Sequence, residues 1–390
     1  MSFSTLPLSY CTNVHPGLSV DEVVAGLERY TAKLPAATGR QVAAGLWLAA
    51  SVISEIESET AKLDQLATTL RRSDLVCYTL NTFPYGNFHG DRVKEQVYLP
   101  DWTSPDRLHY TLACARVLPH LMPPGTEGSL STVPLGYKGF QHPATFRQDC
   151  IANLLRLASG LNDLHDDTGI VVRLAIEPEP MCVLETTAET VAFFTELWAA
   201  ADEEGQLAIA QRHLGVCYDV CHQSVEFEDV AVSIARLQAA GIRINKVHIT
   251  CALRLPTPAD NAIGRAALAH FAEPRYLHQT LARAADGAIH RHPDLDATVC
   301  NTPSAEFAAA DEWRIHYHVP VNAETVGPLL TTRDDLRSAL AAVRQLPYAP
   351  HLEVETYTWG VLPGEQKPDL VAGLAAELNA TRELLDGTAV

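Results

Sequence analysis

Eight short apolar segments, rich in valine, isoleucine, leucine and tyrosine, recur along the 390-residue chain and constrain its fold more than any other feature. Stretches of helical length separate them, with apolar residues at every third or fourth position. This alternation predicts parallel strand–helix–strand units, and eight units predict an α/β protein, the (β/α)8 TIM barrel. The predicted strands are residues 6–13, 42–49, 75–81, 128–136, 171–179, 214–222, 244–250 and 351–357.

Two segments interrupt this alternation, and we expect both as loop insertions at the catalytic face of the barrel. The first, 83–102, is rich in aromatic residues, glycine and proline. The second, 253–322, precedes the last strand and contains a predicted helix at 265–286 and a strand-like run at 314–322. Neither a repeat nor a flexible linker divides the chain, so residues 1–390 are predicted to form one barrel domain.

The charge of the chain limits its partners. It carries 29 basic and 47 acidic side chains, a formal net charge of −18, so we expect no nucleic-acid partner. The sequence contains neither a signal-peptide pattern nor an apolar run of the ~20 residues that a membrane helix needs, which predicts a cytoplasmic protein without membrane insertion. The nine cysteines form no CxxC pair and are expected as buried free thiols.

Acidic and imidazole side chains end the last four predicted strands. In barrels of this type the active site lies at the carboxyl ends of the strands. Several carboxylates at one rim are costly unless a cation neutralises them, so the pattern predicts a metal site. Carboxylates with an imidazole suit one divalent ion, namely Mn²⁺, Co²⁺, Mg²⁺ or Zn²⁺, without choosing among them. The residues concerned are Glu177, Glu179, Asp219, His222, His248, Glu353 and Glu355.

The motifs LAIEPEP, YDVCH, KVHIT and LEVET resemble those of the xylose isomerase-like barrels, a superfamily that includes ketose epimerases and type IV apurinic endonucleases. The resemblance implies that Glu177, Asp219, His248 and one of two glutamates hold the metal. These two, Glu353 and Glu355, are two positions apart on one strand and face the same side, so spacing cannot choose between them. We prefer Glu355 because it lies nearer the rim.

The epimerase branch of this superfamily also suggests residues that contact substrate. There, a histidine three residues after the aspartate and an arginine six residues after the metal-binding histidine contact substrate hydroxyls. His222 and Arg254 stand at these positions. Asn81 and His89, near the end of the third predicted strand, are weaker candidates for substrate contact.

The endonuclease branch carries a multinuclear zinc site built partly from histidines. Here His316 and His318, two residues apart in HYHVPV, face one side and leave open a second metal or a contact from an imidazole to substrate. Glu179 and Glu353 are alternative ligands. The early strands end in residues other than histidine, unlike that branch.

Longer strings spread over the whole chain resemble one narrower family, that of the metabolite traffic protein EboE. They include SYCTNVHPG, LNTFPYGNFHG, VYLPDW, CYDVCHQSVEFED, KVHITCALR, HYHVPV and HLEVETYTWGVLP. This family is encoded in bacterial and cyanobacterial clusters with a prenyltransferase-like membrane protein and a sugar-phosphate-cyclase-like enzyme. The resemblance implies a sugar-derived or cyclitol-type small molecule, and related barrels often form homodimers through their loop-bearing face.

Three functions remain open on the sequence alone. The first is an isomerase or epimerase of a sugar, polyol or cyclitol, in which the metal stabilises an enediolate and Glu177 and Glu355 transfer the proton. The second is a metal-dependent hydrolase, which a second metal completed by His316 and His318 would favour. The third is a metabolite-binding protein without catalytic turnover. No GxGxxG or P-loop motif suggests a nucleotide cofactor.

Overall fold

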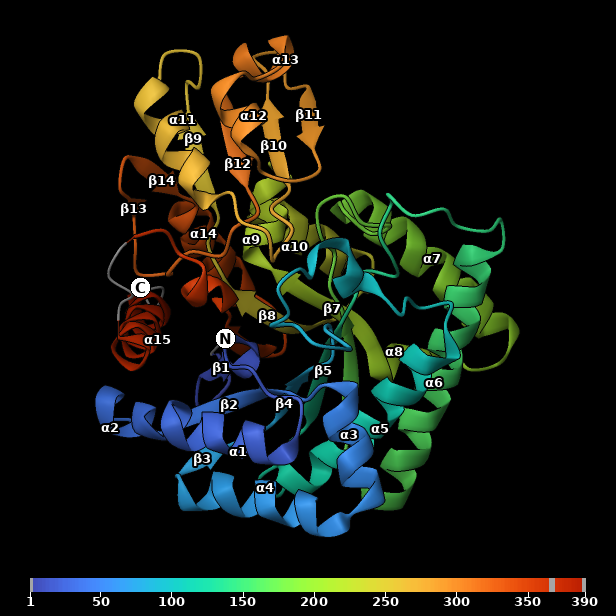
Figure 1. Cartoon of the computed structure of the whole chain (residues 1–390). Helices are drawn as coiled ribbons and strands as arrows, with labels where there is room; N and C mark the ends of the chain where they lie inside the picture. Colours follow the sequence, from blue (N-terminus) through green and yellow to red (C-terminus); the bar gives the residue numbers. More distant parts are fainter. Residues whose placement is uncertain (1–2, 365–368, 388–390) are drawn as a thin grey trace.

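Eight parallel strand positions close into a barrel in the computed structural model, which describes residues 3–364 and 369–387 (Figure 1). The first strand pairs with both the second and the last, which closes the sheet. The fold is therefore a (β/α)8 TIM barrel, as the strand pattern predicts. The strands are β1 (Ser9–Cys11), β2 (Val42–Trp47), β3 (Leu75–Val76), β4 (Thr79–Asn81), β5 (Gly128–Thr132), β6 (Val172–Ile176), β7 (Leu214–Asp219), β8 (Ile244–Ile249) and β15 (His351–Val354).

The third position of the barrel is broken into two short strands. β2 pairs with β3 at Val42 and Ala43, and with β4 at Leu46 and Trp47. Almost every strand residue is buried, because the barrel interior covers one face and the helices cover the other. This explains why the strands are nearly continuous apolar runs in the sequence.

The helices surround the barrel (Figure 1). Several begin at residues that cap their free N–H groups: the Ser19 side chain accepts from Glu22 N, and Thr186 and Glu189 form a reciprocal capping box. No helix among the described residues is long and apolar enough to cross a membrane. The helices are α1 (Val20–Arg29), α2 (Leu34–Thr38), α3 (Ala50–Ser58), α4 (Thr60–Arg72), α5 (Pro105–Leu121), α6 (Phe146–Thr168), α7 (Thr187–Glu203), α8 (Leu207–His213), α9 (Val220–Val225), α10 (Val230–Ala239), α14 (Arg333–Val343) and α15 (Leu370–Gly387), with the 3₁₀ turns η1 (Thr12–Val14), η2 (Thr31–Lys33) and η5 (Tyr357–Gly360).

A second sheet, antiparallel and separate from the barrel, is formed by the part of the chain that connects β8 to β15 (Figure 1, upper part). It follows the carboxyl end of β8, and its strand order is β11-β10-β12-β9-β14-β13. Its elements are β9 (Leu253–Pro256), α11 (Ala262–Leu268), η4 (Ala269–Phe271), β10 (Thr280–Arg283), β11 (Ile289–His292), α12 (Ala297–Asn301), α13 (Ala305–Ala308), β12 (Glu312–Ile315), β13 (Thr325–Val326) and β14 (Leu329–Thr331).

The helix predicted at 265–286 is wrong over most of its length. Helix α11 ends at Leu268, and Thr280–Arg283 forms β10 instead. This segment pairs with β11 on one side and β12 on the other, so hydrogen bonding between strands outweighs the local helical pattern. The strand-like run at 314–322 contributes only its first residues to β12.

The aromatic loop at 83–102 meets this second insertion over the end of the barrel. It contains the 3₁₀ helix η3 (Lys94–Tyr98). The backbone N–H groups of Val93 and Lys94 both donate to Arg275 O at 2.8 Å. The two insertions therefore support each other above the strand ends, where the candidate site lies.

Candidate metal centre

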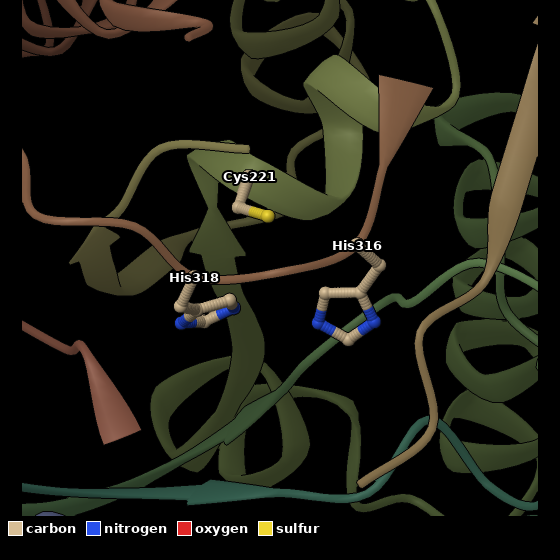
Figure 2. Close-up of side chains that lie close together, drawn as sticks. All are labelled: Cys221, His316 and His318. Atoms are coloured by element: carbon tan, nitrogen blue, oxygen red, sulfur yellow. The ribbon is translucent and has the colours of Figure 1, made fainter. Parts of the chain in front are cut away.

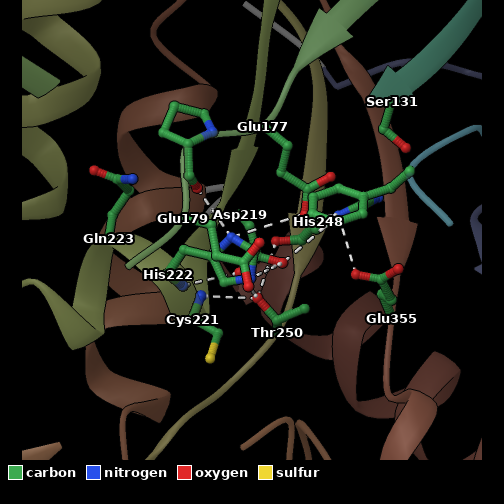
Figure 3. Close-up of polar contacts among 12 residues, drawn as sticks. Ser131, Glu177, Glu179, Asp219, Cys221, His222, Gln223, His248, Thr250 and Glu355 are labelled. Atoms are coloured by element: carbon green, nitrogen blue, oxygen red, sulfur yellow. Dashed lines mark hydrogen bonds and ion pairs between the residues drawn. The ribbon is translucent and has the colours of Figure 1, made fainter. Parts of the chain in front are cut away.

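Four polar side chains from the last four barrel positions converge at the carboxyl ends of the strands (Figure 3). One ligand atom from each of Glu177, Asp219, His248 and Glu355 lies within 4.8 Å of the others, and all four residues are buried. His248 Nδ1 lies 3.1 Å from Glu177 Oε1, 3.1 Å from Glu355 Oε2 and 3.6 Å from Asp219 Oδ2. We call this group the carboxylate cluster.

Glu353 points into the barrel interior below this cluster. Its carboxylate lies 2.5 Å from Lys246 Nζ and accepts a 2.7 Å hydrogen bond from Ser9 Oγ. Burial raises the pKa of Glu353, but Lys246 and His248 together outweigh burial and lower the pKa to about 2. A Cβ at Gly45 would lie 1.4 Å from the Glu353 carboxylate, so glycine leaves the space that this ion pair fills.

The same carboxylate faces the far side of the His248 ring. His248 Nε2 lies 3.3 Å from Glu353 Oε1, while Nδ1 faces the three other carboxylates. A carboxylate behind a histidine holds the ring so that the opposite nitrogen is presented to a metal ion. Of the two glutamates between which the sequence spacing could not choose, Glu355 thus belongs to the cluster and Glu353 lies behind it.

Two asparagines fix Glu355. Asn13 Nδ2 and Asn81 Nδ2 each donate a 2.8 Å hydrogen bond to Glu355 Oε1, which leaves Oε2 facing His248. Asn81 was expected to contact substrate, and the structure places its amide on Glu355. The contact from Asn13 was not anticipated, although each asparagine stands at the end of a predicted strand.

The donor set suits a divalent cation. Asp219 Oδ1 accepts from Thr250 Oγ1 at 2.7 Å and from His222 N at 3.0 Å, which turns Oδ2 toward the cluster. Within the described residues, Asp219 Oδ2 and Glu177 Oε2 are buried without a hydrogen-bond partner. Buried carboxylate oxygens without partners are costly, and a cation would satisfy them. Three carboxylates and one imidazole match the ligands of Mg²⁺, Mn²⁺, Co²⁺ and Zn²⁺.

Three imidazoles form a second group beside the carboxylate cluster. His222 lies on α9, while His316 and His318 follow β12 in the second insertion. Figure 2 shows the last two together with Cys221, whose thiol keeps its proton because burial raises its pKa. We call His222, His316 and His318 the imidazole cluster.

Hydrogen bonds from Nδ1 to oxygen atoms define how each of these rings is protonated. Each Nδ1 faces an oxygen that accepts a hydrogen, so Nδ1 carries the proton and Nε2 presents a lone pair. Burial, the largest cause, lowers the pKa of all three rings, which keeps them neutral. The accepting oxygens are Pro178 O at 3.0 Å for His222, Gln279 Oε1 at 2.6 Å for His316 and Glu355 O at 2.8 Å for His318.

The lone pairs of His222 and His316 face each other, and those of His222 and His318 face Asp219. His222 Nε2 and His316 Nε2 are 3.1 Å apart, and His222 Nε2 and His318 Nε2 each lie 3.9 Å from Asp219 Oδ2. Two lone pairs at this distance, with no hydrogen between them, require a donor or a cation from outside. The imidazole cluster is therefore a second acceptor group that shares Asp219 with the carboxylate cluster.

Glu179 lies beside the imidazole cluster, near His222 and His316. Tyr98 OH donates to its Oε1 at 2.7 Å, and Gln279 Nε2 lies 3.3 Å from the same oxygen. Burial, reinforced by the charge of Glu177, raises the pKa of Glu179 to about 8, so this carboxyl is mostly protonated at neutral pH. Sequence reasoning missed Tyr98 and Gln279, because both come from the insertions.

A cavity lies over both clusters and is lined by Glu177, Glu355 and all three histidines of the imidazole cluster. Its wall is largely aromatic: the Phe88 ring centre lies 4.9 Å from that of Tyr276 and 5.4 Å from that of Tyr357. The lining residues are Asn13, Asn81, Phe83, Pro84, Phe88, Val93, Lys94, Val97, Tyr98, Glu177, Glu179, His222, Tyr276, Leu277, His316, His318, Glu355 and Tyr357.

Two residues expected to contact substrate are not in this lining. Arg254 lies on β9, where Glu312 accepts from its Nε at 3.0 Å and from its Nη2 at 2.8 Å. His89 Nε2 is hydrogen-bonded to Asn13 O at 2.8 Å, and its ring packs beside Trp47. The insertion carries Arg254 away from the cavity, which spacing from His248 could not predict.

Comparison of the whole fold with solved structures identifies its class. A xylose isomerase-like TIM-barrel protein from Mycobacterium smegmatis, in complex with magnesium, is similar over 100% of both chains, with 12% identity and a TM-score of 0.54. An L-ribulose 3-epimerase is similar over 100% of this chain and 96% of its own, with 12% identity and a TM-score of 0.50. The chain thus has the fold of the xylose isomerase-like TIM barrels. Neither a family model nor a curated protein matches its sequence.

Proposed function

We propose that the protein is a divalent-metal-dependent isomerase or epimerase of a sugar, polyol or cyclitol-type compound. The observation that carries the proposal is the convergence of Glu177, Asp219, His248 and Glu355 beneath a cavity that Glu177 and Glu355 line. These four residues would hold the ion. The positive charge of such an ion, when bound, makes a carbon acid beside substrate oxygens easier to deprotonate.

The two glutamates of the carboxylate cluster are placed to move the proton. Glu177 follows β6 and Glu355 follows β15, on either side of β7 and β8, which carry Asp219 and His248. Glu177 Oε2 has no hydrogen-bond partner within the described part of the chain and can accept a proton. Removal by one carboxylate and return by the other, from the opposite side, would invert a carbon centre or shift a carbonyl group.

Metal content tests this proposal directly. We expect about one equivalent of divalent metal per chain in the wild type, measured by elemental analysis after supplementation, and its loss in Asp219→Ala and His248→Ala. His142→Ala is the matched control, because His142 Nε2 bonds Tyr137 O, away from both clusters. Circular dichroism checks that each variant folds. A wild type that stays metal-free after supplementation would contradict the proposal.

A second candidate function, a metal-dependent hydrolase, is favoured by the imidazole cluster. Asp219, His222 and His318 form one potential group for a second ion. Glu179, His222 and His316 form another. Paired ions can activate water for hydrolysis. This function predicts two equivalents of metal. His222→Gln should lose one of them, because His222 belongs to both groups, and His248→Ala should lose the other. A single equivalent that His222→Gln leaves unchanged would favour the isomerase.

We also propose that the protein belongs to the EboE family, on the strength of the strings that span the chain. This assignment favours a cyclitol or sugar-derived metabolite as substrate. A purified protein that holds its metal and binds such a compound, yet incorporates no deuterium into it in D₂O, would instead support a metabolite carrier.

A further inference from the structure

The carboxylate cluster and the imidazole cluster offer mainly hydrogen-bond acceptors to the floor of the cavity. The Nε2 lone pairs of His222, His316 and His318 face it, and Glu177 Oε2 and Asp219 Oδ2 lack partners within the described residues. The amide groups of Asn13 and Asn81 each direct one N–H to Glu355. A substrate must therefore bring donors, such as hydroxyl groups, to this floor.

The cavity lacks a cation that could bind an anionic group of a substrate. Within the described lining, Lys94 is the only lysine or arginine. Its Nζ donates to Glu273 O at 2.8 Å, Tyr276 O at 2.6 Å and Asp294 Oδ2 at 2.6 Å. An ammonium group has three hydrogens, so these three acceptors use them all.

Two other cations near the insertions are also committed elsewhere. Arg254 is held by Glu312, and Lys138 Nζ donates to Glu185 and Glu189. A divalent ion in the carboxylate cluster would not make the net charge of the floor positive, because three carboxylates would surround it. The net charge of the floor therefore disfavours a phosphate group on the substrate.

The upper part of the cavity is apolar. Phe83, Phe88, Val93, Val97 and Leu277 form it together with the lining tyrosines. Phe83, Phe88, Val93 and Leu277 are all less than 10% exposed, so they form an enclosed wall and not an open surface. Polar groups of a substrate placed against these five apolar side chains would lose their hydrogen bonds to water without replacement.

We propose that the substrate is an uncharged compound with neighbouring hydroxyl and carbonyl groups at one end and an apolar group at the other. The polar end lies on the floor, and the apolar end lies against Phe83, Phe88 and Val97. This inference rests on the proposed isomerase or epimerase function and narrows its substrate class. It excludes sugar phosphates and disfavours rings hydroxylated on every carbon.

Equilibrium binding to the full-length protein loaded with Mn²⁺ tests the inference, using two matched pairs of probes in calorimetric titrations. The first pair is 2-hydroxycyclohexanone and 2,3,4,5,6-pentahydroxycyclohexanone, which share a ring and differ in four hydroxyl groups. The second pair is dihydroxyacetone and its phosphate. We expect the first member of each pair to bind at least about tenfold more tightly, because the second leaves polar groups unpaired.

A substitution at Val97 tests whether an added cation creates binding of a phosphate. Val97→Lys places a cation in the apolar wall and should bind dihydroxyacetone phosphate at least about tenfold more tightly than Val97→Met does. Phe88→Ala adds no charge and should weaken binding of 2-hydroxycyclohexanone while leaving dihydroxyacetone nearly unaffected. This second variant keeps the test valid if Val97→Lys does not fold.

Three results would overturn the inference: equal or tighter wild-type binding of the phosphate, equal or tighter binding of the pentahydroxy ring, or no measurable binding of any probe. Failure of the proposed function is a separate result. In that case the probes would bind in the expected order, but no deuterium from D₂O would exchange into the carbon beside the carbonyl group. Exchange in dihydroxyacetone phosphate alone would support the function and overturn the inference.

Discussion

The barrel and the second insertion contribute to one cavity in different ways. The barrel supplies the carboxylate cluster from strand ends, above the fully buried Lys246–Glu353 pair. The insertion supplies His316 and His318 from the chain after β12, together with part of the cavity wall. Its own ion pairs are more exposed, as in Arg254, whose side chain is 24% exposed. The comparison indicates that the barrel fixes the candidate metal ligands, while the insertion shapes the space for a substrate.

The largest effect on stability is expected in the barrel. Lys246→Met removes the partner of Glu353 and leaves a fully buried carboxylate, which should lower the free energy of unfolding by about 3–5 kcal/mol. Urea denaturation followed by circular dichroism measures this change. The double variant Lys246→Met/Glu353→Leu removes both charges and should recover much of the loss. A loss below about 1 kcal/mol in the single variant would contradict the importance of this pair.

A smaller, pH-dependent effect is expected where the insertion rejoins the barrel. Glu377 on α15 accepts hydrogen bonds from Val321 N at 3.2 Å, Thr356 Oγ1 at 2.6 Å and Trp359 Nε1 at 2.9 Å. Burial raises the pKa of Glu377 from 4.5 to about 7. The folded state thus holds this proton more tightly than the unfolded chain does, and deprotonation favours unfolding.

The free energy of unfolding should therefore contain a contribution from Glu377 that falls by about 3 kcal/mol as the pH rises from 4.5 to 7. Glu377→Gln cannot ionise and should lack this contribution at every pH. The measurement is the difference between the two proteins in urea denaturation across this range. A difference that does not change with pH would show that Glu377 titrates normally.

The smallest effect is expected within the insertion. Arg254→Gln breaks the pair with Glu312, but Glu312 keeps Arg314, whose Nε lies 2.6 Å away. Because Arg254 is partly exposed, the loss of stability should be about 1 kcal/mol or less. Thermal unfolding measures this loss, and elemental analysis should show unchanged metal content. A large loss of ligand binding in this variant would indicate that Arg254 contacts the ligand, contrary to the structure.

The sequence predicts the barrel better than the insertion, for a physical reason. A parallel strand is buried on both faces and appears as a continuous apolar run, so each predicted strand overlaps an observed one. A polar residue that ends such a run, as Asp219 does, has no packing reason to be there, and its place at the rim follows. The convergence of the carboxylate cluster could thus be expected from the sequence.

The remaining features depend on contacts between distant segments. Strand β10 is formed by its neighbours β11 and β12, and a local pattern suggested a helix there. The contact from Tyr98 to Glu179 joins the aromatic loop to the end of β6. The orientation of the His316 ring depends on Gln279, which directly precedes β10 in the insertion. No spacing along the chain carries this information.

Asp219 has a consequence for how the two clusters respond to ligands. Its Oδ2 atom lies 3.6 Å from His248 Nδ1 and 3.9 Å from the Nε2 atoms of His222 and His318. One oxygen therefore faces both clusters, and the free energy of filling one depends on whether the other is filled. By thermodynamic reciprocity, each occupant changes the affinity for the other by the same factor. Titrations of the two clusters should therefore be analysed as one coupled equilibrium and not as two independent sites.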